Sequence, residues 1–296
     1  MAVDAILGVP YTAAAEDPLL QFDCYTSSEA VEQPAAGALV FVHGGAWRSE
    51  DKADHASLAR RLAETTKSPV LVPNYRLTAT KRTEHMFRHP GHAQDILDFL
   101  RFLETWALPS QPKGTAAPVR SLILIGHSCS AHMLASIFLD SDHVTPSLCP
   151  PPQLLKAVKG IVMSEGIYDI GLLLKTFPKY ADWFIEDAFG VRDDDYAPFD
   201  VSKYASRTTT GRDPISWLVL HSKADTLIDI PQSQKMYDRL IELNRGQTEG
   251  RILHDFGSLK DEHDDILRGD EYVALIKEFV GHVHGCTTPQ DAASLP

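Results

Sequence analysis

The sequence predicts an α/β fold in which a doubly wound, mainly parallel central sheet carries helices on both faces. Two observations lead to this prediction. Short, continuous apolar runs are followed by glycine or polar turn residues, which is typical of strands buried on both faces. Segments in which apolar residues recur at helical spacing lie between these runs. Strands that alternate with helices pair in parallel, so the two observations together indicate the doubly wound class.

The predicted elements follow one another along the chain. The clearest strands are 38–42, 69–72, 122–125 and 217–220, and a last strand is expected at 251–256. Helices are expected at 55–65, 92–103, 132–138, 232–243 and 266–280. The helix 92–103 is the clearest example, because its leucine and isoleucine side chains share one face.

We expect a single domain over residues 1–284. The chain has 296 residues, of which 44% are hydrophobic and 23% charged, and this is enough to bury a large core. Residues 170–206 are rich in aromatic side chains but have no clear strand pattern, so we expect a small cap over one edge of the sheet. Residues 285–296 are small, polar and aperiodic, and we expect a flexible tail there.

The composition of the chain limits which binding partners and which cellular compartment we expect. The net charge of -12 leaves no basic excess to neutralise phosphates, so we expect a small-molecule substrate and neither nucleic acid nor a membrane as partner. The protein could form a homodimer, and the sequence does not decide this. The four cysteines lack Cys-x-x-Cys spacing, which indicates free thiols in a reducing compartment. Because no signal peptide and no apolar run of ~20 residues is present, we expect a cytoplasmic protein.

The segment Gly126-His127-Ser128-Cys129-Ser130 joins a predicted strand to a predicted helix. A tight turn in this context lifts a serine hydroxyl above the sheet edge, and small residues two positions before and after the serine let strand and helix approach each other. Ser128 is therefore the candidate nucleophile. Ser130 stands where glycine is usual, and the alternative for Ser128 is a structural role as a helix cap.

Two glycines, Gly44 and Gly45, follow the predicted strand 38–42 within His43-Gly44-Gly45-Ala46-Trp47. In acyl-transfer enzymes, backbone N–H groups at this place and the N–H of the residue after the nucleophile bind the oxyanion that develops on the attacked carbonyl. Gly44, Gly45 and Cys129 are therefore the predicted oxyanion hole. A plain turn is the alternative for the two glycines.

A serine nucleophile needs a histidine that accepts its proton and a carboxylate that orients this histidine. Asp225 lies at the carboxyl end of strand 217–220 and is the candidate acid, with Asp229 as the alternative. His263 lies in the polar loop after the last strand and is the candidate base, whereas His254 lies within that strand. The chain order serine, acid, histidine accompanies this type of turn.

A metal site is the competing interpretation of some polar clusters. Three histidines are closely spaced, at His85, His89 and His92. A proline and a glycine among them break any helix that would align them, and no His-Glu-x-x-His spacing occurs. We therefore expect no metal and a solvated histidine-rich loop, with most of the other histidines at the surface.

With these motifs, the sequence resembles the kynurenine formamidase branch of the α/β-hydrolases, close to the fungal arylformamidases. Three further segments carry the resemblance, which spans roughly residues 35–283: Asn74-Tyr75-Arg76-Leu77, Pro90 with Asp95, and Ser164-Glu165-Gly166-Ile167-Tyr168-Asp169. The main departure from the family's pattern is Ser130.

The resemblance implies an α/β-hydrolase fold and hydrolysis of N-formyl-L-kynurenine to L-kynurenine and formate, a step of tryptophan breakdown that can feed NAD synthesis. It implies no cofactor. Four aromatic residues are candidates to pack on the substrate's ring, with core packing as the alternative for each: Trp47, Tyr168, Trp183 and Phe184. A short-chain carboxylesterase and a non-catalytic binding protein on the same fold are the alternative functions.

Overall fold

A computed structural model describes most of the chain. The described residues are 3–14, 16–27, 37–81, 85–107, 119–191, 196–207, 214–245 and 251–285. The expected tail therefore lies, beyond residue 285, outside the described residues.

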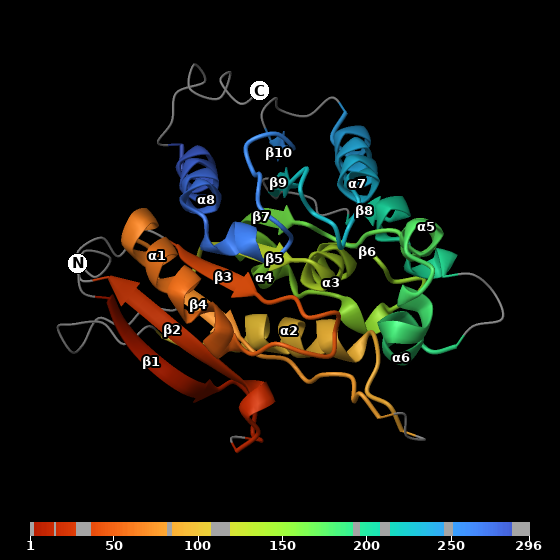
Figure 1. The fold of residues 1–296 in the computed structure, drawn as a ribbon. Helices are drawn as coiled ribbons and strands as arrows, with labels where there is room; N and C mark the ends of the chain where they lie inside the picture. Colours follow the sequence, from red (N-terminus) through yellow and green to blue (C-terminus); the bar gives the residue numbers. More distant parts are fainter. Residues whose placement is uncertain are drawn as a thin grey trace.

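An eight-stranded sheet forms the centre of the molecule, with the strand order β1-β2-β4-β3-β5-β7-β9-β10 (Figure 1). The strands are β1 Val3–Pro10, β2 Gln21–Ser27, β3 Ala38–Val42, β4 Val70–Pro73, β5 Leu122–His127, β7 Val158–Ser164, β9 Ser216–Leu220 and β10 Ile252–Asp255. The pairs from β4 to β10 are parallel, whereas β2 pairs antiparallel with both β1 and β4. The predicted, mainly parallel sheet is confirmed.

Helices cover both faces of this sheet, as predicted. On one face α1 (Ala56–Thr66) packs against α8 (Asp270–Val283), and their apolar side chains meet Leu39 and Phe41 of β3. On the other face α2 (Gly91–Phe102), α3 (Cys129–Phe138) and α7 (Ile230–Leu243) share a core with Val40 and Val42. All five β3 residues are buried because successive side chains enter opposite cores.

Residues 170–206 form short segments at one end of the sheet, apart from 192–195, which are not described (Figure 1). The segments are α5 Ile170–Thr176, a π-helix at Ala181–Ile185, α6 Glu186–Phe189, two 3-10 turns at Ala197–Phe199 and Val201–Lys203, and β8 Ala205–Ser206. β8 pairs antiparallel with β6 (Leu139–Asp140), which directly follows α3. Whether this region acts as a cap stays a prediction.

The remaining short element is α4 (Pro152–Ala157), which leads into β7. None of the helices in the described part of the chain is long and apolar enough to cross a membrane. Three cysteines lie in that part, and all are free: Cys24 and Cys129 are buried, and Cys149 is exposed.

Candidate active site

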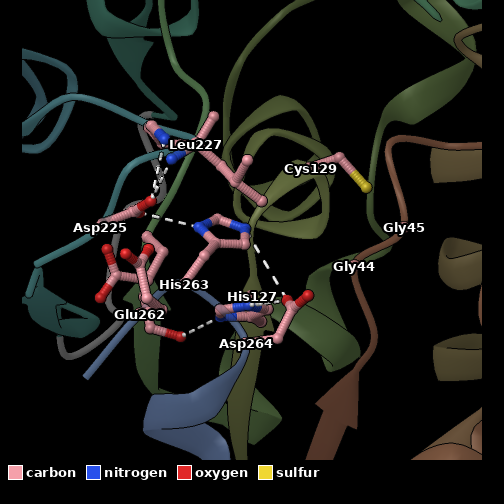
Figure 2. A network of polar contacts seen from close by, with 12 residues as sticks. Gly44, Gly45, His127, Cys129, Asp225, Leu227, Glu262, His263 and Asp264 are labelled. Carbon is pink, nitrogen blue, oxygen red and sulfur yellow. Dashed lines mark hydrogen bonds and ion pairs between the residues drawn. The ribbon is translucent and has the colours of Figure 1, made fainter.

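The carboxyl ends of five parallel strands meet at one edge of the sheet, and each leads into a residue of the candidate site. β5 leads to Ser128, β3 to the Gly44–Gly45 segment, β9 to Asp225 and β10 to the loop that holds His263. The fifth strand, β7, leads to Glu165, which the sequence analysis did not select as a site residue. Parallel pairing brings these ends together although the end of β3 at Val42 and that of β10 at Asp255 are far apart in the chain, and Figure 2 shows Asp225, His263 and the Gly44–Gly45 segment in one view.

Ser128 occupies the sharp turn between β5 and α3. Its φ of 57° and ψ of -124° lie outside the regions that a non-glycine residue favours. Such strain at a functional residue is typical of a nucleophile held above a sheet edge. The side chain of Ser128 makes no capping hydrogen bond to α3, so Ser128 does not act as a side-chain cap of this helix.

Ser130, the departure from the usual glycine, fits the turn by hydrogen bonding. Its hydroxyl accepts from the N–H of His127 at 2.9 Å and lies 2.6 Å from the carbonyl oxygen of Val42 and 2.7 Å from that of His127. The small side chain therefore links the start of α3 to β3 and β5 at the point where the two strands pass closest to the helix. A hydroxyl here satisfies backbone groups in a fully buried place.

Asp225 and His263 form a direct hydrogen bond of 2.8 Å between Oδ2 and Nδ1 (Figure 2). The other carboxylate oxygen, Oδ1, accepts from the N–H groups of Leu227 and Ile228 at 2.8 and 3.0 Å. Burial by itself would raise the pKa of Asp225, but these bonds, the one from His263 first, outweigh it and hold the pKa below its usual range. Asp225 is therefore an anion that fixes the orientation of the imidazole.

The alternative acid and base lie elsewhere. Asp229 precedes α7, and its Oδ2 accepts a hydrogen bond from the Thr176 hydroxyl at 2.8 Å. His254 lies within β10, where its ring packs against that of Tyr237 with centroids 4.2 Å apart. Neither residue is positioned to replace Asp225 or His263.

Ser128 and His263 line the same cavity, but among the described residues no hydrogen bond joins the Ser128 hydroxyl to the imidazole. The free ring nitrogen Nε2 of His263 lies 4.0 Å from Oδ1 of Asp264. The same oxygen is 3.2 Å from Nε2 of the buried His127. Catalytic hydrogen bonds are commonly long without substrate and shorten in the complex, so this geometry is compatible with proton transfer from serine to histidine.

The backbone after β3 passes close to Ser128. A Cβ atom on Gly44 would lie 3.1 Å from Cβ of Ser128, and one on Gly45, where φ is +85°, would lie 2.2 Å from the carbonyl oxygen of Ser49. Gly45 and Ala46 line the cavity, whereas Gly44 and Cys129 lie behind its wall. Ala46, which was not among the predicted oxyanion residues, also has a positive φ, of 51°.

Cys129 occupies the first position of α3, where a backbone N–H has no acceptor within the helix. Its side chain points away from His263, toward the Gly44–Gly45 segment (Figure 2). There the sulfur accepts the N–H of Trp47 at 3.3 Å and lies 3.7 Å from the Tyr75 hydroxyl. Burial raises the pKa of the Cys129 thiol to about 12, so the thiol is neutral and structural.

The cavity beside Ser128 has a volume of about 250 Å³. Of the four aromatic residues predicted to bind substrate, Trp183 and Phe184 line it. Trp47 and Tyr168 do not: both are fully buried, and Trp47 packs edge-on against Phe189 with ring centroids 5.0 Å apart. For these two the core-packing alternative holds, because the turns after β3 and β7 direct their side chains into the interior.

The expected solvated histidine loop is wrong. His85 is exposed, but His89 is largely buried against Phe189 and His92 is fully buried, with Nε2 2.8 Å from the Thr78 hydroxyl. Burial lowers the pKa of both buried rings, that of His92 to about 3. Apart from the candidate base His263, five other histidines are buried as well, against the expectation of surface positions: His43, His55, His127, His132 and His221.

Two clusters in the described part of the chain bring three potential metal-ligating atoms within 4.8 Å of one another: His127, His263 and Asp264, and Glu165, His221 and Asp225. Each cluster contains a member of the Asp225–His263 pair. A hydrogen bond between His127 and Asp264 lies within the first cluster, and in the second the His221 ring lies 3.4 Å from Glu165 and 3.9 Å from Asp225. That the protein uses no metal stays a prediction.

The chain as a whole is similar to known hydrolases. A family model for the alpha/beta hydrolase fold matches residues 39–223. The kynurenine formamidase of Eremothecium gossypii is 29% identical over 261 residues, which are 85% of this chain and 96% of that protein. The kynurenine formamidase of Meyerozyma guilliermondii is 25% identical over 246 residues, 82% of this chain and 84% of that protein. The predicted resemblance is thereby confirmed.

Solved structures show the same architecture. Esterase B from Lactobacillus rhamnosis (HN001) superposes with a TM-score of 0.71 at 16% identity, and the match covers 98% of this chain and 88% of that one. At this identity the likeness concerns the fold. The segment that matches the family model runs from β3 to just beyond β9, which is most of the sheet and both of its helical faces, and the chain belongs to the α/β-hydrolase family.

Proposed function

We propose that the protein is a serine hydrolase that converts N-formyl-L-kynurenine to L-kynurenine and formate. The observation that carries the proposal is that His263, hydrogen-bonded to Asp225, lines the same cavity as the strained Ser128, in a chain whose curated relatives are kynurenine formamidases. In this mechanism the hydroxyl oxygen of Ser128 attacks the formyl carbon while Nε2 of His263 accepts the hydroxyl proton. Asp225 stabilises the imidazolium that results.

The negative charge that develops on the formyl oxygen is bound by backbone N–H groups of the 44–46 segment and of Cys129. His263 then gives its proton to the nitrogen of the departing aryl amine, and the formyl group stays on Ser128 as an ester. A water molecule, deprotonated by His263, attacks this ester and releases formate. An aryl amine leaves more readily than an alkyl amine, so an esterase-like triad is sufficient for this amide.

The cavity walls suit a substrate with an aromatic ring and a charged amino acid group. One wall is apolar and comprises Ile167, Tyr180, Trp183, Phe184, Leu227 and Ile228. A second, polar part of the lining comprises Arg48, Glu50 and Asp264. Burial opposes ionisation of Glu50, but the hydrogen bond from His55 outweighs it and holds the pKa of Glu50 below its usual range. The substrate's ring packs against the first wall, and its ammonium and carboxylate groups face the second.

A comparison of substrates tests the activity. We expect kcat/KM for N-formyl-L-kynurenine to exceed by far that for p-nitrophenyl acetate or p-nitrophenyl butyrate, because a formyl-specific acyl site excludes larger acyl groups. Equal or faster turnover of the butyrate ester would instead support a short-chain carboxylesterase.

The variant Ser128→Ala tests the nucleophile. It should lose turnover and labelling by a fluorophosphonate probe while its far-UV circular dichroism stays unchanged. Loss of activity in this variant also argues against a non-catalytic binding protein, whereas undiminished activity would remove Ser128 from the mechanism.

The setting of the enzyme follows from the same proposal. The reaction places it in tryptophan breakdown, upstream of NAD synthesis, with a small molecule as its partner. We place it in the cytoplasm, and a homodimer is the assembly to test, by light scattering of the purified protein.

A further inference from the structure

Glu165 is a fully buried carboxyl group next to the acid of the triad. It directly follows β7 and has a positive φ of 51°, which turns its side chain under the loop after β9. Its Oε1 accepts the N–H of Ser222 at 2.8 Å. Its Oε2 accepts no hydrogen bond from the described residues. The nearest basic atom to it is Nδ1 of His221, at 3.4 Å.

Within the described part of the chain, no cation balances a charge on Glu165. Among the described residues the only basic group within 4.0 Å of its carboxyl oxygens is His221. Nε2 of that ring lies 3.2 Å from the carbonyl oxygen of Ile228, which can only accept, and so carries the proton. Nδ1 lies 2.8 Å from the Ser233 hydroxyl, which can donate to it. Burial lowers the pKa of His221, so the ring is neutral and leaves Glu165 uncompensated.

Asp225 is the second carboxyl group of this cluster. The potential ligand atoms of Glu165, His221 and Asp225 lie within 4.8 Å of one another. Two ionised carboxylates at such a distance in the interior repel each other, so one of them takes up a proton. Asp225 is held as the anion by His263 and two backbone N–H groups, whereas Glu165 accepts only one backbone N–H.

We propose that the Glu165 carboxyl group is uncharged in the active enzyme and donates its proton in a hydrogen bond to Asp225, which makes Glu165 a positioning residue of the triad. The bond fills a further acceptor site of the Asp225 anion and ties the loop after β9 to the end of β7. The hydrogen bond thereby holds Asp225 against Nδ1 of His263. It also makes the Asp225 carboxylate a weaker base, so the proton stays on Nδ1 of His263. This inference rests on the triad of the proposed function but not on the identity of the acyl group.

The remaining titratable groups around Glu165 agree with this assignment. Burial raises the pKa of the Glu165 carboxyl well above its usual range, and the adjacent Asp225 raises it further. Tyr168, in the loop after β7, and Tyr272, from α8, also face this cluster, and burial raises the pKa of both phenols. Both are neutral, so Asp225 carries the only charge of the cluster until His263 is protonated.

The test compares Glu165→Gln, which keeps a neutral donor, with Glu165→Leu, which removes the donor, and uses Glu242→Gln on exposed α7 as control. Activity is measured with both p-nitrophenyl acetate and N-formyl-L-kynurenine, so failure of the substrate assignment does not affect the result. Glu165→Gln and the control should keep near wild-type kcat. Glu165→Leu should lose about 10- to 100-fold in kcat with little change in KM, as expected for one lost hydrogen bond to a charged group.

Two readouts separate positioning from a merely structural role. In the pH profile of kcat/KM, the acidic limb should move to higher pH in Glu165→Leu, because an Asp225 anion that has lost a hydrogen-bond donor stabilises the imidazolium of His263 more strongly. In Glu165→Gln the acidic limb should stay unchanged. The infrared difference spectrum of wild type minus Glu165→Gln at neutral pH should contain the C=O band of a protonated carboxylic acid. Absence of this band, or equal loss of kcat in the Gln and Leu variants, would overturn the proposal.

Discussion

A protonated Glu165 makes the stability of the protein depend on pH in a defined direction. The unfolded chain exposes this carboxyl, whose pKa is then about 4.3. In the folded protein burial first, and then Asp225, raise the pKa well above that value. Between the two values the folded state binds one proton more than the unfolded state, so the contribution of Glu165 to stability is complete below the lower value and is lost as the pH rises.

The magnitude follows from proton linkage. One proton released on unfolding lowers the free energy of unfolding by about 1.4 kcal/mol per pH unit. At pH 7, which is about 2.7 units above the pKa of the unfolded side chain, the cost of keeping Glu165 protonated is about 3.7 kcal/mol. Glu165→Gln removes this dependence. The Asp225 contribution has the opposite sign, but it is present in both proteins and cancels in their difference.

Urea denaturation of wild type and Glu165→Gln at several values between pH 5 and pH 8 measures the effect. The difference in the free energy of unfolding should move in favour of the Gln variant by about 1.4 kcal/mol for each unit of rising pH. Glu242→Gln, which makes the same substitution at an exposed carboxylate, is the matched control. Parallel stability curves for wild type and Glu165→Gln would show that Glu165 is ionised in the folded protein and would refute the reasoning.

Three further predictions concern packing and the oxyanion segment. Trp47→Ala should lower the free energy of unfolding by about 3–5 kcal/mol, because Trp47 is fully buried. Trp183→Ala should change the free energy of unfolding by no more than about 0.5 kcal/mol and should raise KM for N-formyl-L-kynurenine. Denaturation and steady-state kinetics check both variants, and a severely unstable Trp183 variant would contradict the assignment of Trp183 to the cavity. Ser130→Ala should cost about 1–3 kcal/mol, since the buried N–H of His127 loses its acceptor, and an unchanged melting temperature would argue against this role. Gly45→Ala should lower kcat by about 100-fold or more, because the added Cβ collides with the backbone of Ser49 and displaces the amides, so near wild-type activity would exclude Gly45 from the oxyanion hole.

The central strands could be predicted because each is buried on both faces and therefore reads as a continuous apolar run. Strand 38–42 was predicted with the bounds that β3 has. β1 and β2 were not predicted. β1 is the antiparallel edge of the sheet, where Leu7 is 63% exposed and the pairing is irregular between Ile6 and Val9. β2 is mostly buried, but the polar Asp23 interrupts its apolar run. A half-exposed, interrupted strand leaves a weak pattern in the sequence.

The candidate triad could be predicted because chain order and strand ends are visible in the sequence. Glu165 was not selected, since a glutamate after a strand is ordinarily exposed and nothing local indicates that β9 brings Asp225 beside it. The buried histidines were wrongly placed for the same reason: burial of His92 depends on partners such as Thr78 that sit in a different segment. Long-range packing, which local pattern does not encode, also decided that Trp47 enters the core rather than the cavity.

The position of the cysteines has a practical consequence for chemical labelling. Cys129 lies directly after the nucleophile, yet its thiol is fully buried and neutral, so alkylating reagents should leave it intact. Cys149, which follows the 3-10 turn Pro146–Leu148 well away in the chain from Ser128, is exposed. A maleimide dye should therefore attach at Cys149 in preference to Cys24 or Cys129, and a fluorophosphonate can mark Ser128 in the same molecule. Among the described residues, Ser128 and Cys149 thus offer two chemically orthogonal handles, one in the candidate active site and one at the exposed surface.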